Sequence, residues 1–233
     1  MKIKVIIPVS TGKWNEEVEA RYSAIKAPET VIEVMHLTHG PEAIQSEYDE
    51  ASVTPYVLKE VSSALKRKYD GILIYCFSDP ALSAAREVST IPVTGIGESS
   101  QLFAMGIADR IGIIATVDHT VPKIRRKLSA RGFSGRFPSV RGLNIPVLEL
   151  DEPERVITRA LQVTGIMVHE DGVEALILGC GSMLNIKERI QEAFSIPVIE
   201  PGEVALKHLE ALIRLGISHS KKAFMTPLPV NAL

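Results

Sequence analysis

The sequence lacks the features typical of nucleic-acid-binding, membrane-spanning and disulfide-rich proteins. Its 233 residues include 2 cysteines and 1 tryptophan, and the formal net charge is -2, with no block of like charges. The basic footprint of a nucleic-acid-binding protein is therefore missing. No stretch approaches the roughly 20 apolar residues of a membrane span, and the apolar run after Met1 is too short for a signal peptide. We expect a soluble, cytoplasmic protein that binds neither nucleic acid nor membrane.

The sequence also lacks the patterns of common metal and nucleotide sites. Its six histidines show no pairing at the spacing of zinc ligands. The stretch Gly95-x-Gly97-x-x-Ser100 fails the dinucleotide fingerprint at its third glycine, and no Walker A sequence is present. In a reducing compartment, two cysteines do not favour a structural disulfide. They are either inert core residues or chemically used.

Strand-like and helix-like segments alternate along the chain. Apolar residues make up 45% and charged residues 23%, which is enough for a packed core. The alternation predicts α/β architecture with parallel sheets. The predicted strands are residues 2–9, 30–37, 71–75, 92–95, 110–116, 146–150, 175–178 and 197–199. The predicted helices are residues 15–23, 54–69, 79–88, 120–131, 153–170, 186–194 and 203–215, and residues 41–49 form a short helix or an ordered loop.

An internal repeat divides the chain into two similar units. The motif at residues 91–98 matches residues 196–203 at Ile, Pro, Val, the second Gly and Glu. Upstream in both halves, an apolar strand is followed by a cysteine and then by a helix. Cys180 follows Cys76 by 104 positions and the motifs are 105 apart, so one gap aligns both landmarks. We predict two pseudo-symmetric α/β domains related by duplication, residues 1–100 plus 207–233 and residues 101–206, with the active site in the cleft between them.

Both cysteines follow a predicted strand directly. Ligands of open α/β sheets bind beyond the carboxyl ends of the strands, so each thiol is expected at a ligand-binding edge. Each cysteine also precedes a predicted helix, for which Ser78 or Asp79 in one half and Ser182 in the other are candidate caps. A helix N-terminus carries unpaired N–H groups and partial positive charge, so it favours a thiolate and receives anions.

Two equivalent thiols facing one cleft suit a reaction that runs both ways. Racemisation needs one base to remove a Cα proton and one acid to deliver a proton to the opposite face. Cys76 and Cys180 would exchange these roles in the reverse direction. A thiol with a pKa of about 8.5 reaches both forms near neutral pH, and the free enzyme would hold one thiolate and one thiol. The alternative is that both cysteines are small buried hydrophobes.

Three stretches carry a resemblance to a known family. They are Tyr-Cys-Phe-Ser-Asp-Pro-Ala-Leu at residues 75–82, Ile-Pro-Val-Thr-Gly-Ile-Gly-Glu-Ser-Ser at 91–100 and Leu-Gly-Cys-Gly-Ser-Met at 178–183. Together they closely resemble the Asp/Glu/hydantoin racemase superfamily, and its hydantoin and allantoin racemase branch is the nearest. The resemblance covers nearly the whole chain. One departure is the loop after the first strand, where Ile-Pro-Val-Ser-Thr at residues 7–11 replaces the family's Asn-Pro-Asn-x-Ser/Thr.

The resemblance implies an isomerase, a racemase or epimerase in which two cysteines transfer protons without a metal or other cofactor. It also implies a homo-oligomer, a dimer or larger. The expected substrate is a small molecule with a carbonyl-activated Cα–H, of the 5-substituted hydantoin type. The catalytic candidates are Cys76 and Cys180, and the substrate-binding candidates are Ser10, Thr11, Phe77, Ser78, Asp79, Thr116, Gly181 and Ser182.

Other functions remain open at this point. Aspartate or glutamate racemisation and maleate cis–trans isomerisation also belong to proteins of this superfamily. Arylmalonate decarboxylases resemble the fold but keep only the second cysteine, so Cys76 argues against them. A non-enzymatic protein that closes on a small ligand would need no reactive thiol pair.

Overall fold

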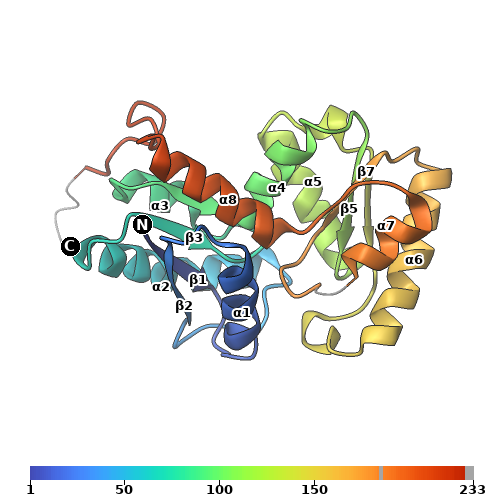
Figure 1. Cartoon of the computed structure of the whole chain (residues 1–233), viewed down its shortest axis with the longest axis horizontal. Helices are drawn as coiled ribbons and strands as arrows, with labels where there is room; N and C mark the ends of the chain where they lie inside the picture. The colour runs from blue at the N-terminus through green and yellow to red at the C-terminus, as the bar shows by residue number, and fades with distance from the viewer. Residues whose placement is uncertain (184–185, 229–233) are drawn as a thin grey trace.

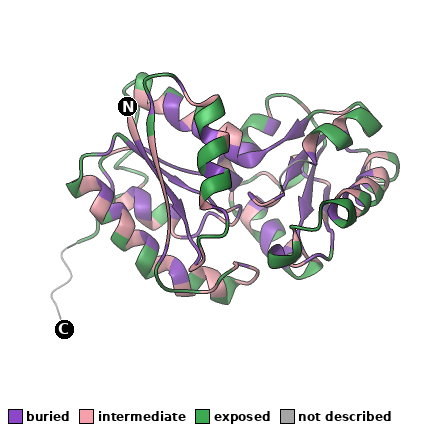
Figure 2. Cartoon of the chain, turned by 60° about the horizontal axis from the view of Figure 1, so that its bottom comes forward, coloured by how far each residue is buried: buried purple, intermediate pink, exposed green. Residues whose placement is uncertain are grey.

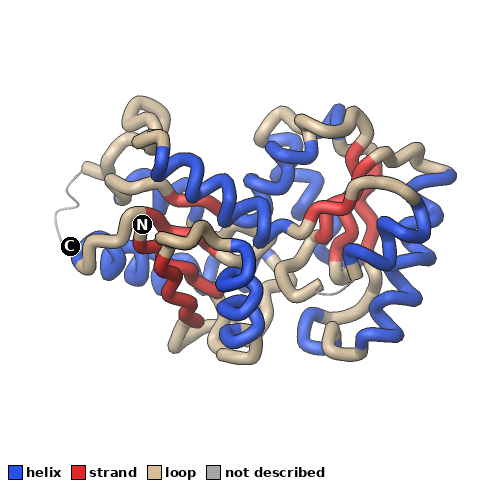
Figure 3. Tube along the Cα trace, viewed as in Figure 1, coloured by secondary structure: helices blue, strands red, loops and turns tan. Residues whose placement is uncertain are grey.

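Two four-stranded parallel sheets form the framework of the protein. The computed structural model describes residues 1–183 and 186–228, and Figure 1 and Figure 3 show a sheet in each half of the molecule. The first sheet has the order β2-β1-β3-β4 and the second the order β6-β5-β7-β8. The strands are β1 (Lys2–Ile7), β2 (Val31–His36), β3 (Gly71–Ile74), β4 (Val93–Gly95), β5 (Ile111–Ala115), β6 (Ser139–Gly142), β7 (Ala175–Leu178) and β8 (Val198–Ile199). The identical order in both sheets confirms the predicted α/β fold with duplicated parallel-sheet units.

Strands and helices alternate in the same order in both halves, so each strand is followed by one α-helix. The helices are α1 (Asn15–Ile25), α2 (Glu47–Lys66), α3 (Leu82–Val88), α4 (Ile96–Ala104), α5 (Val121–Ala130), α6 (Pro153–His169), α7 (Lys187–Phe194) and α8 (Pro201–Arg214). The central strands β3, β5 and β7 are buried along their whole length, because helices cover both faces of the sheets (Figure 2).

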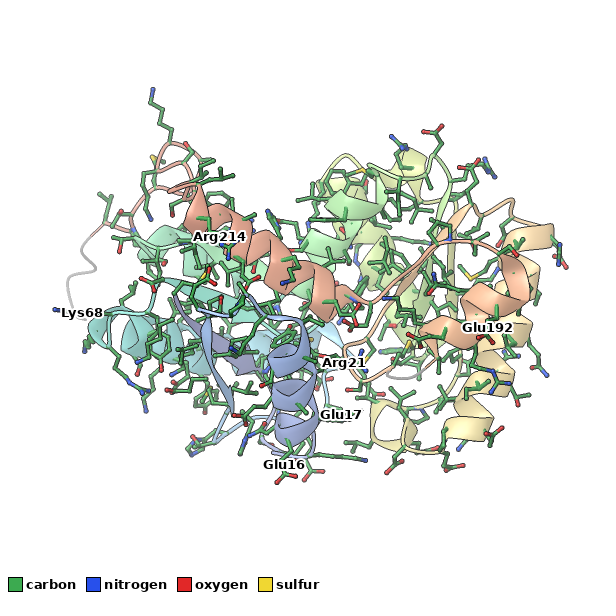
Figure 4. All side chains as sticks on the ribbon, in the orientation of Figure 1. Glu16, Glu17, Arg21, Lys68, Glu192 and Arg214 are labelled. Carbon is green, nitrogen blue, oxygen red and sulfur yellow. The ribbon has the colours of Figure 1, made fainter. Side chains whose placement is uncertain are left out.

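The last helix of each unit connects the two halves. Helix α8 follows the second sheet but packs on β3 and β4 of the first, and α4 follows the first sheet but contacts β7 of the second. Arg21 of α1, labelled in Figure 4, reaches Glu203 at the start of α8 at 3.4 Å. The boundaries after residues 100 and 206 fall inside α4 and α8, and the division into two domains stays a prediction.

The structure corrects three predicted segments. The strand expected at residues 146–150 is a 3-10 turn at Val147–Glu149, and the fourth strand of that sheet is Ser139–Gly142 instead. Helix α2 begins at Glu47 rather than at residue 54, because Ser46 and Asp49 form a capping box ahead of it. Helix α3 begins at Leu82 rather than at residue 79, because Asp79 and Ala81 adopt positive φ angles of 49° and 61°.

Candidate active site

A small cavity lies where strands of both sheets end at their carboxyl edges. It has an empty volume of about 430 Å³. Its walls come from the ends of β1, β3 and β7 and from the loops after β2 and β6. The lining residues are Ile7, Pro8, Val9, Trp14, Ala43, Ile44, Tyr75, Cys76, Phe77, Val147, Cys180, Gly181 and Ser182. Both cysteines are free thiols and both are partly exposed, so the structure brings Cys76 and Cys180 into one pocket.

The two sulfur atoms have the same kind of backbone partner. The N–H of Ser182 donates to Cys180 Sγ at 3.4 Å, and the N–H of Ser78 holds down the pKa of Cys76 in the same way. In both halves the donor stands two residues after the cysteine. These turn N–H groups stabilise negative charge on sulfur.

The expected helix N-termini are not at the thiols. Helix α3 begins six residues after Cys76, and α7 begins seven residues after Cys180. Neither cysteine therefore stands in the first turn of the helix that follows it. The expectation that a helix begins directly after each cysteine is therefore wrong, and the backbone N–H groups that act on the two sulfurs belong to turns.

Burial dominates the ionisation of both thiols. It raises the pKa of Cys76 to about 12, against the lowering effects of the Ser78 N–H and of Lys123. It raises the pKa of Cys180 as well, and the carboxylate of Glu200 adds to that rise. The thiolate is therefore the scarce form of each cysteine near neutral pH.

Tyr75 links the two cysteine turns. It stands directly before Cys76, is buried in the core, and donates from its hydroxyl to the carbonyl oxygen of Gly181 at 2.9 Å. A Cβ on Gly181 would lie 2.5 Å from Tyr75 Cε1, and one on Gly202 would lie 2.7 Å from Cε2. The tyrosine ring fits between two glycines, so the turn of Cys180 rests on the residue next to Cys76.

The predicted binding residues divide into two groups. Phe77, Gly181 and Ser182 line the cavity beside the thiols. Ser10, Thr11 and Thr116 are not among the residues of its wall. Thr11 Oγ1 accepts from the N–H of Lys13 at 3.3 Å in its own loop, whereas the backbones of Ser10 and Thr116 bond to other segments. Ser10 N–H donates to the carbonyl of Pro41 at 3.0 Å, and Ile145 N–H donates to the carbonyl of Thr116 at 3.0 Å.

Ser78 and Asp79 point away from the cavity into polar networks. The hydroxyl of Ser78 accepts from Lys123 at 2.8 Å. Asp79 is buried and accepts from the N–H groups of Gly97 and Glu98 at 2.9 and 2.7 Å, so it caps α4 rather than its own helix. Neither residue caps α3 as expected, because the turn after Cys76 ends in Ala81 with no side-chain cap.

The apolar walls of the cavity were missed by sequence reasoning. These walls include Trp14, Ile44 and Val147. Ile44 and Val147 occupy equivalent loops, since one follows β2 and the other follows β6. Among the described residues, the wall has no charged side chain.

Within residues 1–183 and 186–228, no three His, Cys, Asp or Glu side chains come together as metal ligands would. In the same part of the chain, no helix combines the length and apolarity of a membrane span. The absence of a metal or cofactor stays a prediction.

The protein is thus a duplicated α/β protein whose central cavity holds one thiol from each half. The chain belongs to the Asp/Glu/Hydantoin racemase family, whose model matches residues 3–209. It is 35% identical over 222 residues to "Hydantoin racemase" of Rhizobium meliloti, covering 95% of this chain and 92% of that one. The predictions of family and of an isomerase of the racemase type are confirmed.

Solved structures of two relatives have the same architecture. The fold superposes with a TM-score of 0.92 on an allantoin racemase from Klebsiella pneumoniae, 30% identical, covering 100% of this chain and 96% of that one. It superposes with a TM-score of 0.94 on an allantoin racemase from Pseudomonas fluorescens, 27% identical, covering 100% of both chains.

Proposed function

We propose that this protein racemises 5-substituted hydantoins, with Cys76 and Cys180 as opposed acid and base. The observation that carries the proposal is the cavity, in which both thiols meet and whose described wall has no charged side chain. The hydantoin racemase of Rhizobium meliloti, at 35% identity, supports the same substrate class.

The proposed reaction is a proton exchange across the ring. The thiolate of one cysteine takes the C5 proton, and the electron pair of the C–H bond moves onto the adjacent carbonyl as an enolate. The other thiol then donates its proton to the opposite face of C5, so one thiol and one thiolate remain with their roles exchanged. Backbone N–H groups in the turns at Phe77–Ser78 and Gly181–Ser182 are the candidate donors to the developing negative charge.

The wall of the cavity favours a neutral ring over an amino acid. An α-carboxylate and an ammonium group would lose their hydration on entering and would find no opposite charge among the described lining residues. Ile44, Val147 and Trp14 offer apolar surface to a substituent at C5 instead. Allantoin, the substrate named for the two solved relatives, is the second candidate, although its ureido group would face these apolar side chains.

The test follows optical rotation of single enantiomers without added cofactor. The panel contains 5-benzylhydantoin, 5-isopropylhydantoin, allantoin, aspartate and glutamate. We expect racemisation of the hydantoins, and a loss of about a thousandfold in both the Cys76→Ala and the Cys180→Ala variant. Unchanged melting temperatures of the variants control for folding.

Three outcomes would contradict the proposal. Full racemase activity in either alanine variant would exclude the two-thiol reaction. Turnover of aspartate or glutamate alone would reassign the substrate class. A succinyl adduct on one cysteine after incubation with maleate, detected by mass spectrometry, would favour a cis–trans isomerase.

A further inference from the structure

Lys123 is a buried cation beside the turn of Cys76. It lies on α5 of the second half, and its side chain is 4% exposed. Its ammonium group donates to the hydroxyl of Ser78 at 2.8 Å and lies 3.7 Å from the carboxylate of Glu50. Burying an ammonium group is costly unless it is paired. Here Ser78 and Glu50 are its partners, so the buried charge is held at the turn of Cys76.

The turn of Cys76 is held by two lysines against one carboxylate. Lys127, one helical turn after Lys123, donates to the carbonyl oxygen of Ser78 and to Glu50. The three charged groups together leave net positive charge next to Ser78. Since Ser78 is bound at both its hydroxyl and its carbonyl, its N–H stays directed at the sulfur of Cys76.

Cys180 has no equivalent of this cation in the part of the chain that the structure describes. The charged side chain that acts on its ionisation is Glu200, a buried carboxylate. The two thiols of the cavity therefore differ in their charged neighbours, although their positions in the repeat are equivalent: Lys123 lowers and Glu50 raises the pKa of Cys76, whereas Glu200 raises that of Cys180.

We propose that Lys123 is a positioning residue that supplies the positive charge on which the thiolate of Cys76 depends, and that Cys180 ionises without it. The inference rests on the proposed two-thiol reaction. Lys123 is not part of the cavity wall; it lines a separate hollow between α5 and the loop before α2, with Gln45 and His119. It therefore acts on Cys76 through Ser78 and through its charge, and it does not touch the substrate.

The test measures the thiols one at a time, without substrate. In the Cys180→Ser background, the rate of alkylation of Cys76 by iodoacetamide reports its thiolate fraction from pH 7 to pH 10. We expect Lys123→Met to slow this reaction about tenfold at pH 8, because losing a nearby opposite charge raises a thiol pKa by about one unit. Lys123→Arg, which keeps the charge, should restore most of the rate.

The other groups that face this turn are the same in both members of each compared pair, because the replaced cysteine is shared by the parent and the Lys123 variant. They are Glu50 on α2, Lys127 and Arg131 on α5, Asp79 on the turn itself, and Cys180 with Glu200 across the cavity. The matched control is Lys123→Met in the Cys76→Ser background, where alkylation of Cys180 should change less than twofold.

Two results would overturn the proposal. One is an equal slowing of both thiols, which would mean that the lysine only supports the structure. The other is an unchanged rate at Cys76. If the methionine variant fails to fold, Lys123→Gln replaces it. This variant keeps a donor for Ser78 but no charge, so it should slow the alkylation of Cys76 in the same way. Because no racemase substrate is used, failure of this test is separate from failure of the proposed function.

Discussion

Asp79 and Glu200 each cap a helix, but they do so from different positions in the two halves. Glu200 precedes α8 directly and accepts from two first-turn N–H groups at 3.1 and 2.6 Å. The equivalent position before α4 is Gly95, where a Cβ would lie 2.2 Å from Asp79 Oδ1. The carboxylate that caps α4 therefore comes from the turn of Cys76, which ties the catalytic candidate to the helix that follows β4.

The raised thiol pKa values predict an alkaline optimum for racemisation. Both pKa values lie above that of a free thiol because of burial, so most of the enzyme carries two protonated, inactive thiols near neutral pH. Raising the pH creates the active pair of one thiolate and one thiol. We expect kcat/KM to rise about tenfold per pH unit from pH 6 to pH 8 and to fall only when the second thiol ionises.

Polarimetry at constant ionic strength measures this profile. The Cys76→Ala variant at each pH corrects for uncatalysed racemisation of the substrate. A flat profile between pH 6 and pH 8, or an optimum below pH 7, would show that one thiol is already ionised in the resting enzyme.

The sequence predicts which residues meet but not what surrounds them. The repeat placed Cys76 and Cys180 at equivalent strand ends, and the structure brings both into the cavity. The helix ends expected beside them depend on where α3 and α7 begin. Positive φ angles at Asp79 and Ala81 delay α3, and such a turn is set by tertiary contacts of Asp79 with α4 and Arg131.

Two tyrosines provide a matched pair of tests for how the elements hold the site. Tyr75 donates to the carbonyl of Gly181 at 2.9 Å, and Tyr22 on α1 donates to the carbonyl of Gly202 at 3.0 Å. The rings meet edge to face, with centroids 5.8 Å apart. Only Tyr75 lines the cavity, among the described residues.

Tyr75→Phe should lower kcat while Tyr22→Phe should not. Each change removes one buried hydrogen bond and should cost about 1 kcal/mol of unfolding free energy. Loss of the Tyr75 bond also frees the turn of Cys180, so we expect kcat to fall about fivefold or more with KM within twofold. Steady-state kinetics and urea unfolding of both variants check this. Equal kinetic effects in the two variants would mean that Tyr75 has no special link to the thiols.

The misplaced strand of the second sheet has a clear physical origin. The short apolar stretch Pro-Val-Leu-Glu-Leu at 146–150 is consistent with a buried strand, but Val147 is buried because it lines the cavity, and Leu148 is exposed. The true strand, β6, is at the edge of its sheet and contains Arg141, which pairs with Asp171 at 2.7 Å. A short, charged edge strand carries little hydrophobic signal.

On the scale of the molecule, the repeat predicted the architecture better than any local pattern did. Equal strand orders follow from duplication, and so does a helix after each Ile-Pro-Val motif. The predicted division assigns residues 207–233 to the first unit, and most of α8 does pack on β3 and β4 of the first sheet.

The loops that close the cavity are joined across the halves by a few polar contacts. Gln45 Oε1 accepts from the N–H of Val147 at 3.0 Å, in partly buried surroundings. Lys13 reaches the carbonyl of Leu148 and the carboxylate of Asp151, both at 3.0 Å, but this pair is more exposed. Exposed ion pairs contribute little, so Gln45 is the stronger of the two connections.

Gln45→Ala should raise KM by about fivefold, because closure over the substrate loses a hydrogen bond of about 1 kcal/mol. The Val147 N–H would be left without its acceptor, and the 3-10 turn that carries Val147 would close less tightly against the first half. Gln45→Glu keeps an acceptor at the same place and should retain a KM within twofold of the parent. Initial rates over a range of substrate concentrations measure both variants. An unchanged KM in the alanine variant, or an equal rise in both, would mean that the loops close without this contact, since only the alanine variant removes the acceptor.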